Sequence, residues 1–142
     1  MSTQHWSQGH LRELSRGECL GLLATKAVGR IAHAGPDGPE VVPLNFVLQH
    51  DTVLFATSPH SVLGRQLGLD VAAFQVAAFQ VDDSDDDTQS GWSVLLRGRV
   101  EPVETDDLPP AAARPHPWAS GQRSLRLRLV PRTITGRRLL PG

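Results

Sequence analysis

Short strand-forming segments separated by tight turns limit this chain to a mostly β fold more strongly than any other feature. Residues 28–34 and 39–48 contain the valine, isoleucine and phenylalanine side chains that favour strands, and the turn sequence Gly-Pro-Asp-Gly at 35–38 joins them. A second turn at residues 49–51 leads to a third strand at 52–57. Strands with connections this short pair in antiparallel fashion, because a parallel pair needs a crossover of about a dozen residues. We therefore expect an antiparallel meander in the first half of the chain.

The second half of the chain contains longer strand candidates. Residues 72–81 and 91–103 are expected to be strands, and residues 134–140 a last short one. Leucines alternate with arginines over residues 125–129, as in a strand with one buried face. An irregular, proline-rich connection at residues 104–121 precedes that strand. Connections of this length in compact domains are often functional or form interfaces.

Two short helices are expected among these strands. Ser15 and Glu18 have the spacing of a capping box, which predicts a helix over about residues 16–24. The leucines and valine of residues 61–69 suggest a second helix after the third strand. Six antiparallel strands with two helices indicate one small all-β barrel domain. We expect a disordered tail at residues 1–10 and the domain at 11–142.

Charge and cysteine content exclude several classes of function. The formal net charge is −1 and the 14 lysine and arginine residues are scattered, so no basic surface for nucleic acid or an anionic membrane is expected. No apolar run approaches the roughly 20 residues of a membrane helix, and the first ten residues lack the apolar core of a signal peptide. Cys19 is the only cysteine, which is typical of a reducing compartment. We expect a cytoplasmic protein.

Two unusual segments and the histidines need separate interpretations. Five aspartates occur within residues 82–87, but the spacing and central glycine of a calcium-binding loop are missing, so a solvated loop is expected. Ala-Ala-Phe-Gln-Val occurs at 72–76 and again at 77–81. Because the shift is odd, it turns each side chain to the opposite face of a strand, and a bulge, a helical turn or a longer strand must absorb it. The histidines lack zinc-site spacing, so no metal site is expected.

Several short motifs, in a fixed order from Leu14 to Leu139, resemble one known family. They are Leu-Ser-Arg-Gly-Glu-Cys-Leu-Gly-Leu-Leu at 14–23, Val-Gly-Arg-Ile-Ala at 28–32, Val-Val-Pro-Leu-Asn-Phe at 41–46, Phe-Ala-Thr-Ser-Pro-His-Ser at 55–61, Phe-Gln-Val-Asp-Asp at 79–83, Gly-Trp-Ser-Val-Leu-Leu-Arg-Gly at 91–98, Pro-Trp at 117–118 and Ile-Thr-Gly-Arg-Arg at 134–138. The chain resembles the pyridoxamine 5'-phosphate oxidase-like FMN-binding split-barrel family. The resemblance implies a six-stranded antiparallel split β-barrel of Greek-key type. It also implies a homodimer whose interface forms two equivalent flavin mononucleotide (FMN) sites.

The resemblance also implies which residues bind the cofactor. Four strand residues would lie beside the flavin ring, three hydroxyl residues would contact the phosphate and ribityl chain, and two more would lie near the cofactor or across the dimer interface. In that order they are Val42, Pro43, Leu44 and Asn45; Thr57, Ser58 and Ser61; and Trp92 and Ser93. Structural alternatives remain for these residues: an edge strand with a solvent-facing amide, a helix cap at Ser58 or Ser61, and a core or interface aromatic at Trp92.

The chain departs from the family pattern at the expected phosphate site. A basic residue is usual at or just after the position of Ser61, where this chain has Val62 and Leu63. Arg65 is the nearest cation, about one helical turn further along. Either Arg65, Arg30 or another arginine replaces the missing residue, or flavin binding is weak or lost. Trp118, on the proline-rich connection, either covers the flavin of the partner subunit or anchors the connection.

No nucleophile–base pair is recognisable, so no catalytic residue is predicted. This fits a redox enzyme whose chemistry belongs to its cofactor. We expect an FMN-dependent oxidoreductase that acts on a small organic molecule. The alternative is a non-catalytic or degenerate barrel that binds or sequesters flavin, a deazaflavin or haem. The substrate-phosphate residues of pyridoxamine phosphate oxidation itself are not recognisable.

Overall fold

The secondary structure follows the predicted alternation of strands and turns. The computed structural model describes residues 9–67, 75–119, 121 and 123–142, and residues 1–8 of the expected tail lie outside this range. Its elements are β1 (His10–Glu13), α1 (Arg16–Leu23), β2 (Val28–Gly35), β3 (Gly38–Gln49), β4 (Thr52–Thr57), α2 (Val62–Leu67), β5 (Gln75–Asp85), β6 (Ser90–Pro102) and β7 (Leu125–Leu140), with 3-10 turns at Thr105–Asp107 and Ala111–Ala113. Residues 68–69 of the second predicted helix lie outside the described residues. None of the described helices is long and apolar enough to span a bilayer.

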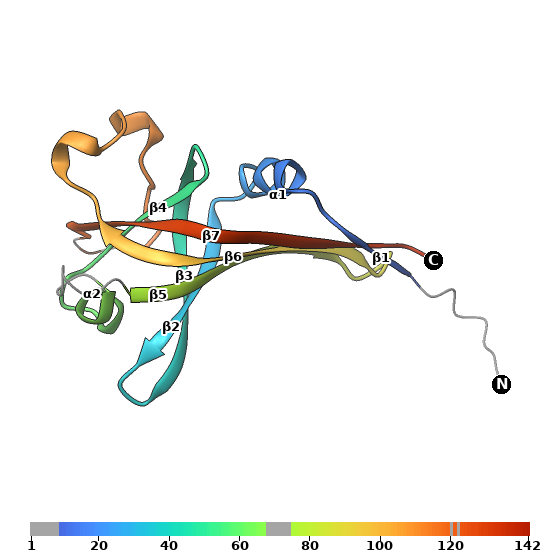
Figure 1. Cartoon of the computed structure of the whole chain (residues 1–142), viewed down its shortest axis with the longest axis horizontal. Coiled ribbons are helices and arrows are strands. Elements are labelled where there is room, and N and C mark those ends of the chain that lie inside the picture. Colours follow the sequence, from blue (N-terminus) through green and yellow to red (C-terminus); the bar gives the residue numbers. More distant parts are fainter. Residues whose placement is uncertain (1–8, 68–74, 120, 122) are drawn as a thin grey trace.

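Six of the strands close into a ring. The sheet order is β1-β7-β4-β3-β2-β5-β6, and β6 also pairs with β7, so β2 to β7 form a closed antiparallel barrel. β2, β3 and β4 are a meander, and β5 returns to pair with β2, which is a Greek-key arrangement. β1 pairs with the C-terminal part of β7 as an additional strand. Figure 1 shows β6 and β7 as a long ribbon that runs along the whole molecule. The predicted six-stranded split barrel is confirmed.

Three strand predictions need correction. β1 had no predicted counterpart. The aspartate segment is not simply a loop, because β5 continues to Asp85, where Asp82 and Asp83 form ion pairs with Arg30 and Lys26 at 3.3 and 2.8 Å. No group of three or more metal-ligating side chains gathers in the described part of the chain. The strands predicted at residues 125–129 and 134–140 are one continuous strand, β7. The register of β6 with β7 shifts between Arg97 and Gly98, and this bulge lets β7 continue past its internal proline.

The tandem Ala-Ala-Phe-Gln-Val repeat is absorbed by the length of β5. Val76 and Val81 occupy equivalent positions in the two copies, yet Val76 is 76% exposed and Val81 is buried. In the second copy Ala77 and Phe79 are buried as well. Residues 72–74 of the first copy lie outside the described residues. The odd shift therefore places the two valines on opposite faces, as strand geometry requires.

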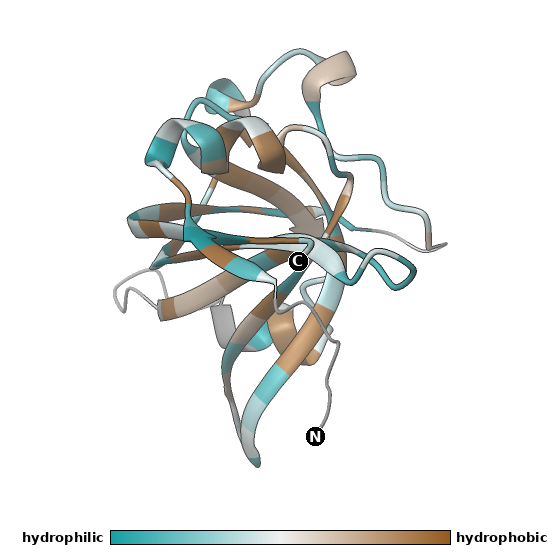
Figure 2. Cartoon of the chain, turned by 90° about the vertical axis from the view of Figure 1, so that its right-hand side faces the viewer, coloured by the Kyte–Doolittle hydropathy of each residue, from teal (hydrophilic) through white to brown (hydrophobic). Residues whose placement is uncertain are grey.

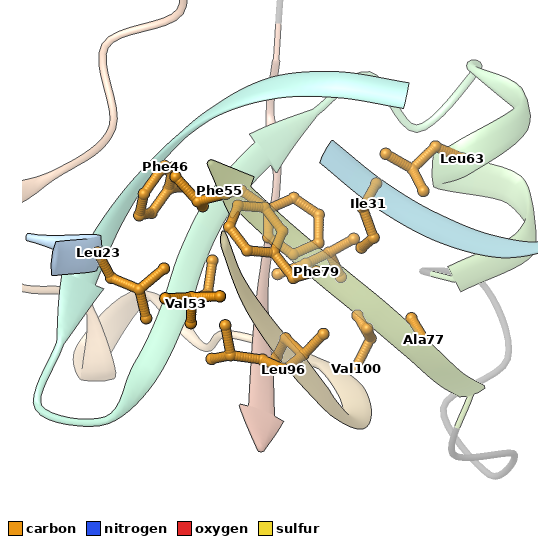
Figure 3. Close-up of a cluster of buried hydrophobic side chains, with 14 of the residues drawn as sticks. Leu23, Ile31, Phe46, Val53, Phe55, Leu63, Ala77, Phe79, Leu96 and Val100 are labelled. Carbon is orange, nitrogen blue, oxygen red and sulfur yellow. The ribbon is translucent and has the colours of Figure 1, made fainter. Parts of the chain in front are cut away.

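Phenylalanines at the centre of the barrel fix its packing. The rings of Phe46 and Phe79 meet edge to face, with centroids 4.9 Å apart and planes at 70°. Figure 3 shows Phe46, Phe55 and Phe79 gathered in the middle of the buried cluster. Gly29 makes room for Phe79, because a Cβ atom there would lie 2.3 Å from Cζ of that ring. Hydrophobic segments lie mainly on the strands in Figure 2, in keeping with a core inside the barrel.

α1 begins at the predicted capping box and covers part of β7. The amide of Glu18 donates to Oγ of Ser15 at 3.2 Å, and the amide of Ser15 donates to Oε1 of Glu18 at 3.0 Å. Cys19 and Leu23 of α1 are fully buried. Burial raises the pKa of the Cys19 thiol, in agreement with the prediction of a small buried apolar residue.

Candidate functional site

One edge of β3 is open along half of the strand. β3 pairs with β2 from Gly38 onward, but it pairs with β4 only from Phe46, which lies opposite Phe55. The amide of Phe46 donates to the carbonyl of Ala27 at 3.1 Å. Because backbone groups alternate along an antiparallel strand, Pro43 and Asn45 direct theirs away from β2, toward the open edge. Pro43 lacks an N–H group and so costs no hydrogen bond with β2, and the predicted edge position is confirmed.

A groove of about 280 Å³ lies along this open edge. Its walls come from β3, the end of β4, the start of α2 and the proline-rich connection, and Figure 1 shows α2 and this connection at the same end of the barrel. The lining residues are Glu40, Val42, Pro43, Leu44, Asn45, Ala56, Thr57, Ser61, Val62, Leu63, Pro117, Ala119 and Arg123. Six of the ten predicted cofactor-binding residues are among them: Val42, Pro43, Leu44, Asn45, Thr57 and Ser61.

The groove combines an apolar floor with a few polar groups. Val42 and Leu44 pack against the hydrophobic core, and Leu63 of α2 is 4% exposed. In Figure 3 Leu63 projects from its helix toward Ile31 of β2. Mostly apolar surface with few polar groups is typical of small-molecule sites.

The hydroxyl groups near α2 are engaged with one another. Oγ of Ser61 donates to the carbonyl of Ser58 at 2.8 Å, accepts from the amide of Gly64 at 2.9 Å and lies 3.1 Å from Oγ1 of Thr57. Since Ser61 has a single hydroxyl proton, Thr57 is the donor to Ser61. Oγ of Ser58 accepts from the amide of His60 at 3.2 Å. The helix-cap alternative is therefore confirmed for Ser61, whereas a phosphate contact for these hydroxyls stays a prediction.

The side chain of Asn45 links three segments around the groove. Its Nδ2 donates to the carbonyl of Ala27 at 3.2 Å, and its Oδ1 accepts from the amide of Trp118 at 2.8 Å. The proline-rich connection is thus anchored through the backbone of Trp118, a residue that is 76% exposed. Asn45 lines the groove as predicted. These two hydrogen bonds use part of the hydrogen-bonding capacity of its amide group, so less of it is left for a ligand.

The predicted arginines do not line the groove, and a different one does. Arg65 is exposed on α2 outside the lining residues, and Arg30 binds Gln80 and Asp82 on the outer face of the sheet. Arg123 lines the groove instead. Sequence reasoning missed it because nothing local indicates that the end of the proline-rich connection folds back over β3.

Glu40 was also missed, although the alternation along the β2–β3 hairpin could have indicated it. Glu40 lines the groove and lies opposite His33 of β2, with Oε2 3.8 Å from Nε2 of the imidazole. The side chain of His33 is fully buried, and neither of its nitrogens has a hydrogen-bond partner among the described residues.

Trp92 and Ser93 lie outside the groove. Both are on β6, opposite Arg138 and Arg137 of β7, and neither is among the groove residues. Trp92 packs against the hydrophobic core. Within one chain these two residues therefore do not join the other predicted site residues, and a shared site would need a second copy.

A closed antiparallel ring of six strands, with a groove beside the open edge of β3, is the architecture of a split-barrel protein. A family model described as pyridoxamine 5'-phosphate oxidase matches residues 15–138. The chain belongs to this family, which confirms the resemblance seen in its motifs.

Several proteins are similar to this chain, and their functions are mostly not established. The uncharacterized protein Rv0080 of Mycobacterium tuberculosis is 26% identical over 129 residues, which cover 90% of this chain and 85% of the relative. The structure of an FAD binding protein from Mycobacterium smegmatis is 29% identical with a TM-score of 0.66, covering 91% of this chain and 98% of that one. The structure of a protein from Corynebacterium glutamicum, named there as a proposed pyridoxamine 5'-phosphate oxidase, is 25% identical with a TM-score of 0.75. The match covers 93% of this chain and 95% of that one.

Proposed function

We propose that the groove binds a flavin, with the ring against the open edge of β3, and that the protein is a flavin-dependent oxidoreductase for a small organic molecule. The observation that carries this proposal is the coincidence of unpaired strand backbone and an apolar floor in one groove. The resemblance favours FMN, and the relationship to an FAD binding protein adds FAD as a candidate.

The groove residues fit the two sides of a flavin ring system. The pyrimidine part of the ring carries carbonyl and N–H groups, which match the backbone groups that Pro43 and Asn45 direct to the open edge. The benzenoid part is apolar and matches the floor of Val42, Leu44 and Leu63.

A second copy of the chain would complete the site. Two of the predicted cofactor-binding residues, Trp92 and Ser93, lie on β6 outside the groove, so one chain alone does not gather the predicted site. Exposed apolar side chains lie beside the groove, since Val41 is 62% and Trp118 is 76% exposed. We propose a homodimer in which Trp92 and Ser93 of the partner subunit approach the ring. A mass by light scattering equal to two chains supports the dimer, and a mass equal to one chain contradicts it.

The residues of this chain would bind and orient, while a bound flavin supplies the hydride or electron transfer. The backbone of β3 would orient the ring and tune it by hydrogen bonding. Val42, Leu44 and Leu63 would exclude water from the apolar side of the groove.

Flavin fluorescence tests the binding step directly. Titration of the protein into riboflavin should quench the emission to saturation. Val62→Trp, which fills the groove with an indole, should abolish the quenching, and Val76→Trp is the matched control at an exposed position outside the groove. Absence of quenching by the unaltered protein, or equal quenching by Val62→Trp, contradicts the proposal.

The oxidoreductase step needs its own assay. Flavin reduced beforehand and bound to the protein should reduce a quinone, with two electrons and two protons passing to the acceptor. We expect this reaction to be faster than with the same concentration of free reduced flavin. A rate equal to that of free flavin contradicts catalysis and leaves a binding module.

A further inference from the structure

A second cavity, of about 220 Å³, continues the groove beneath the proline-rich connection. Ala56, Pro117 and Arg123 line both spaces. The cavity lies over the face of β4 that carries Leu54 and Ala56, and the connection covers it from outside. A ligand that occupies the groove can therefore extend into this cavity along one continuous surface.

The wall of the second cavity is basic. It contains Arg114, His116, Arg123 and Arg126, and no carboxylate is present among its described lining residues. The groove itself contains Glu40 and one arginine. Clefts lined by charges of one sign concentrate the opposite charge, so an anion is favoured in the cavity over the Glu40 end of the groove.

Arg126 is the cation best placed to receive an anion. It lies on β7 directly opposite Ala56, so its side chain shares the cavity face of the sheet. It is partly buried, and its guanidinium has no hydrogen bond or ion pair with any residue that the structure describes. The nearby Arg128 differs, because its Nε donates to Oε1 of Glu101 at 2.7 Å.

A second guanidinium in the wall, that of Arg114, hydrogen-bonds through one nitrogen among the residues that the structure describes. Nε of Arg114 donates to the carbonyl of Pro109 at 2.8 Å, which orients the group and leaves its two terminal amino groups for a ligand. The two terminal amino groups of a guanidinium can form a pair of parallel hydrogen bonds with phosphate oxygens.

We infer that this basic cavity holds the phosphate of the flavin cofactor's tail, an inference that rests on the proposed function. The predicted phosphate contacts at Thr57 and Ser61 are less suited, since the Ser61 proton is given to Ser58 and the Thr57 proton to Ser61. The phosphate of FMN and the diphosphate of FAD share the required chemistry. The arginines that line the cavity thus replace the basic residue that is absent at Val62 and Leu63.

Titration of three flavins against two variants tests the inference. Riboflavin, FMN and FAD are titrated into the unaltered protein, Arg126→Gln and Arg132→Gln, where Arg132 is an exposed control on the same strand. Loss of a charge-assisted hydrogen bond should weaken the binding of FMN or FAD roughly tenfold to a hundredfold, and only in Arg126→Gln. Riboflavin, which lacks phosphate, should bind all three proteins equally and confirms that they are folded.

The outcomes separate this inference from the proposed function. If riboflavin binds and Arg126→Gln leaves FMN and FAD unchanged, the phosphate site is refuted while the ring site stands. A loss confined to FAD identifies the diphosphate as the recognised group, and a loss for both flavins identifies the shared monophosphate. If no flavin binds, inorganic pyrophosphate tests the cavity alone: an Arg126-dependent rise in thermal midpoint supports an anion site, and no rise overturns it.

Discussion

Removing the Asn45 side chain should release the proline-rich connection from the groove. Asn45→Ala deletes two hydrogen bonds, one from the amide of Trp118 at 2.8 Å and one to the carbonyl of Ala27 at 3.2 Å. At about 0.5–1.5 kcal/mol each, their loss lowers the free energy of unfolding by about 1–3 kcal/mol. Both bonds are solvent-exposed, which favours the lower end of that range.

The two hydrogen bonds can be separated by a second variant. Asn45→Asp keeps an acceptor for the amide of Trp118 but removes the donor to Ala27 and places a carboxylate beside that carbonyl. We expect Asn45→Asp to retain protection of the Trp118 amide, although its free energy of unfolding falls. In Asn45→Ala the same amide should lose about 1 kcal/mol of protection, close to a fivefold faster exchange.

Hydrogen exchange by NMR, with urea unfolding measured in parallel, provides the assay. The Trp118 amide reports the opening of the connection, and the urea transition reports global stability. Unchanged exchange at Trp118 in Asn45→Ala, or equally fast exchange in both variants, would refute the role of Asn45 as the anchor.

Three further predictions concern the barrel itself. Gly29→Ala should lower the free energy of unfolding by about 1–3 kcal/mol, because the new Cβ would lie 2.3 Å from Cζ of Phe79, and adding Phe79→Leu should relieve part of the loss in urea unfolding. Ser15→Ala removes the cap of α1 and should cost about 1 kcal/mol by the same measurement, an expectation that an unchanged urea midpoint contradicts. Burial of Glu101 raises its pKa, but hydrogen bonds from Arg128 and a second arginine outweigh this and hold the pKa below its ordinary value of 4.5. A carboxyl whose pKa is lowered on folding stabilises the fold above its ordinary pKa, and this stabilisation is lost as pH falls through the folded pKa. The difference in free energy of unfolding between the native chain and Glu101→Gln should therefore shrink from pH 7 to 3. A constant difference contradicts the ion pair.

Local patterns predicted most of the strands because each strand has its own buried face. The alternation at residues 125–129 correctly indicated the start of β7, and the turn at 35–38 fixed the β2–β3 hairpin. The continuity of β7 was missed because a bulge opposite Gly98 cancels the effect of Pro131, and that compensation involves two strands. Likewise, Asp82 and Asp83 of β5 pair with Arg30 on β2 and with Lys26 just before β2, partners that the local sequence around the aspartates does not reveal.

The groove was only partly predictable because four separate segments form it. Val42 to Asn45, Thr57 and Ser61 were predicted from motifs and do line one groove. Arg123 and Glu40 were missed, since their places depend on how the connection and the hairpin fold over β3. Sequence also could not show that Thr57 donates its hydroxyl proton to Ser61 and that Ser61 donates its own to the carbonyl of Ser58.

Backbone NMR spectra during a riboflavin titration test the central claim, that a flavin ring lies against the open edge of β3. The amides of Val41, Asn45 and Thr57 should shift progressively and saturate together with the fluorescence quenching. No shift at these three amides under saturating riboflavin would contradict the claim.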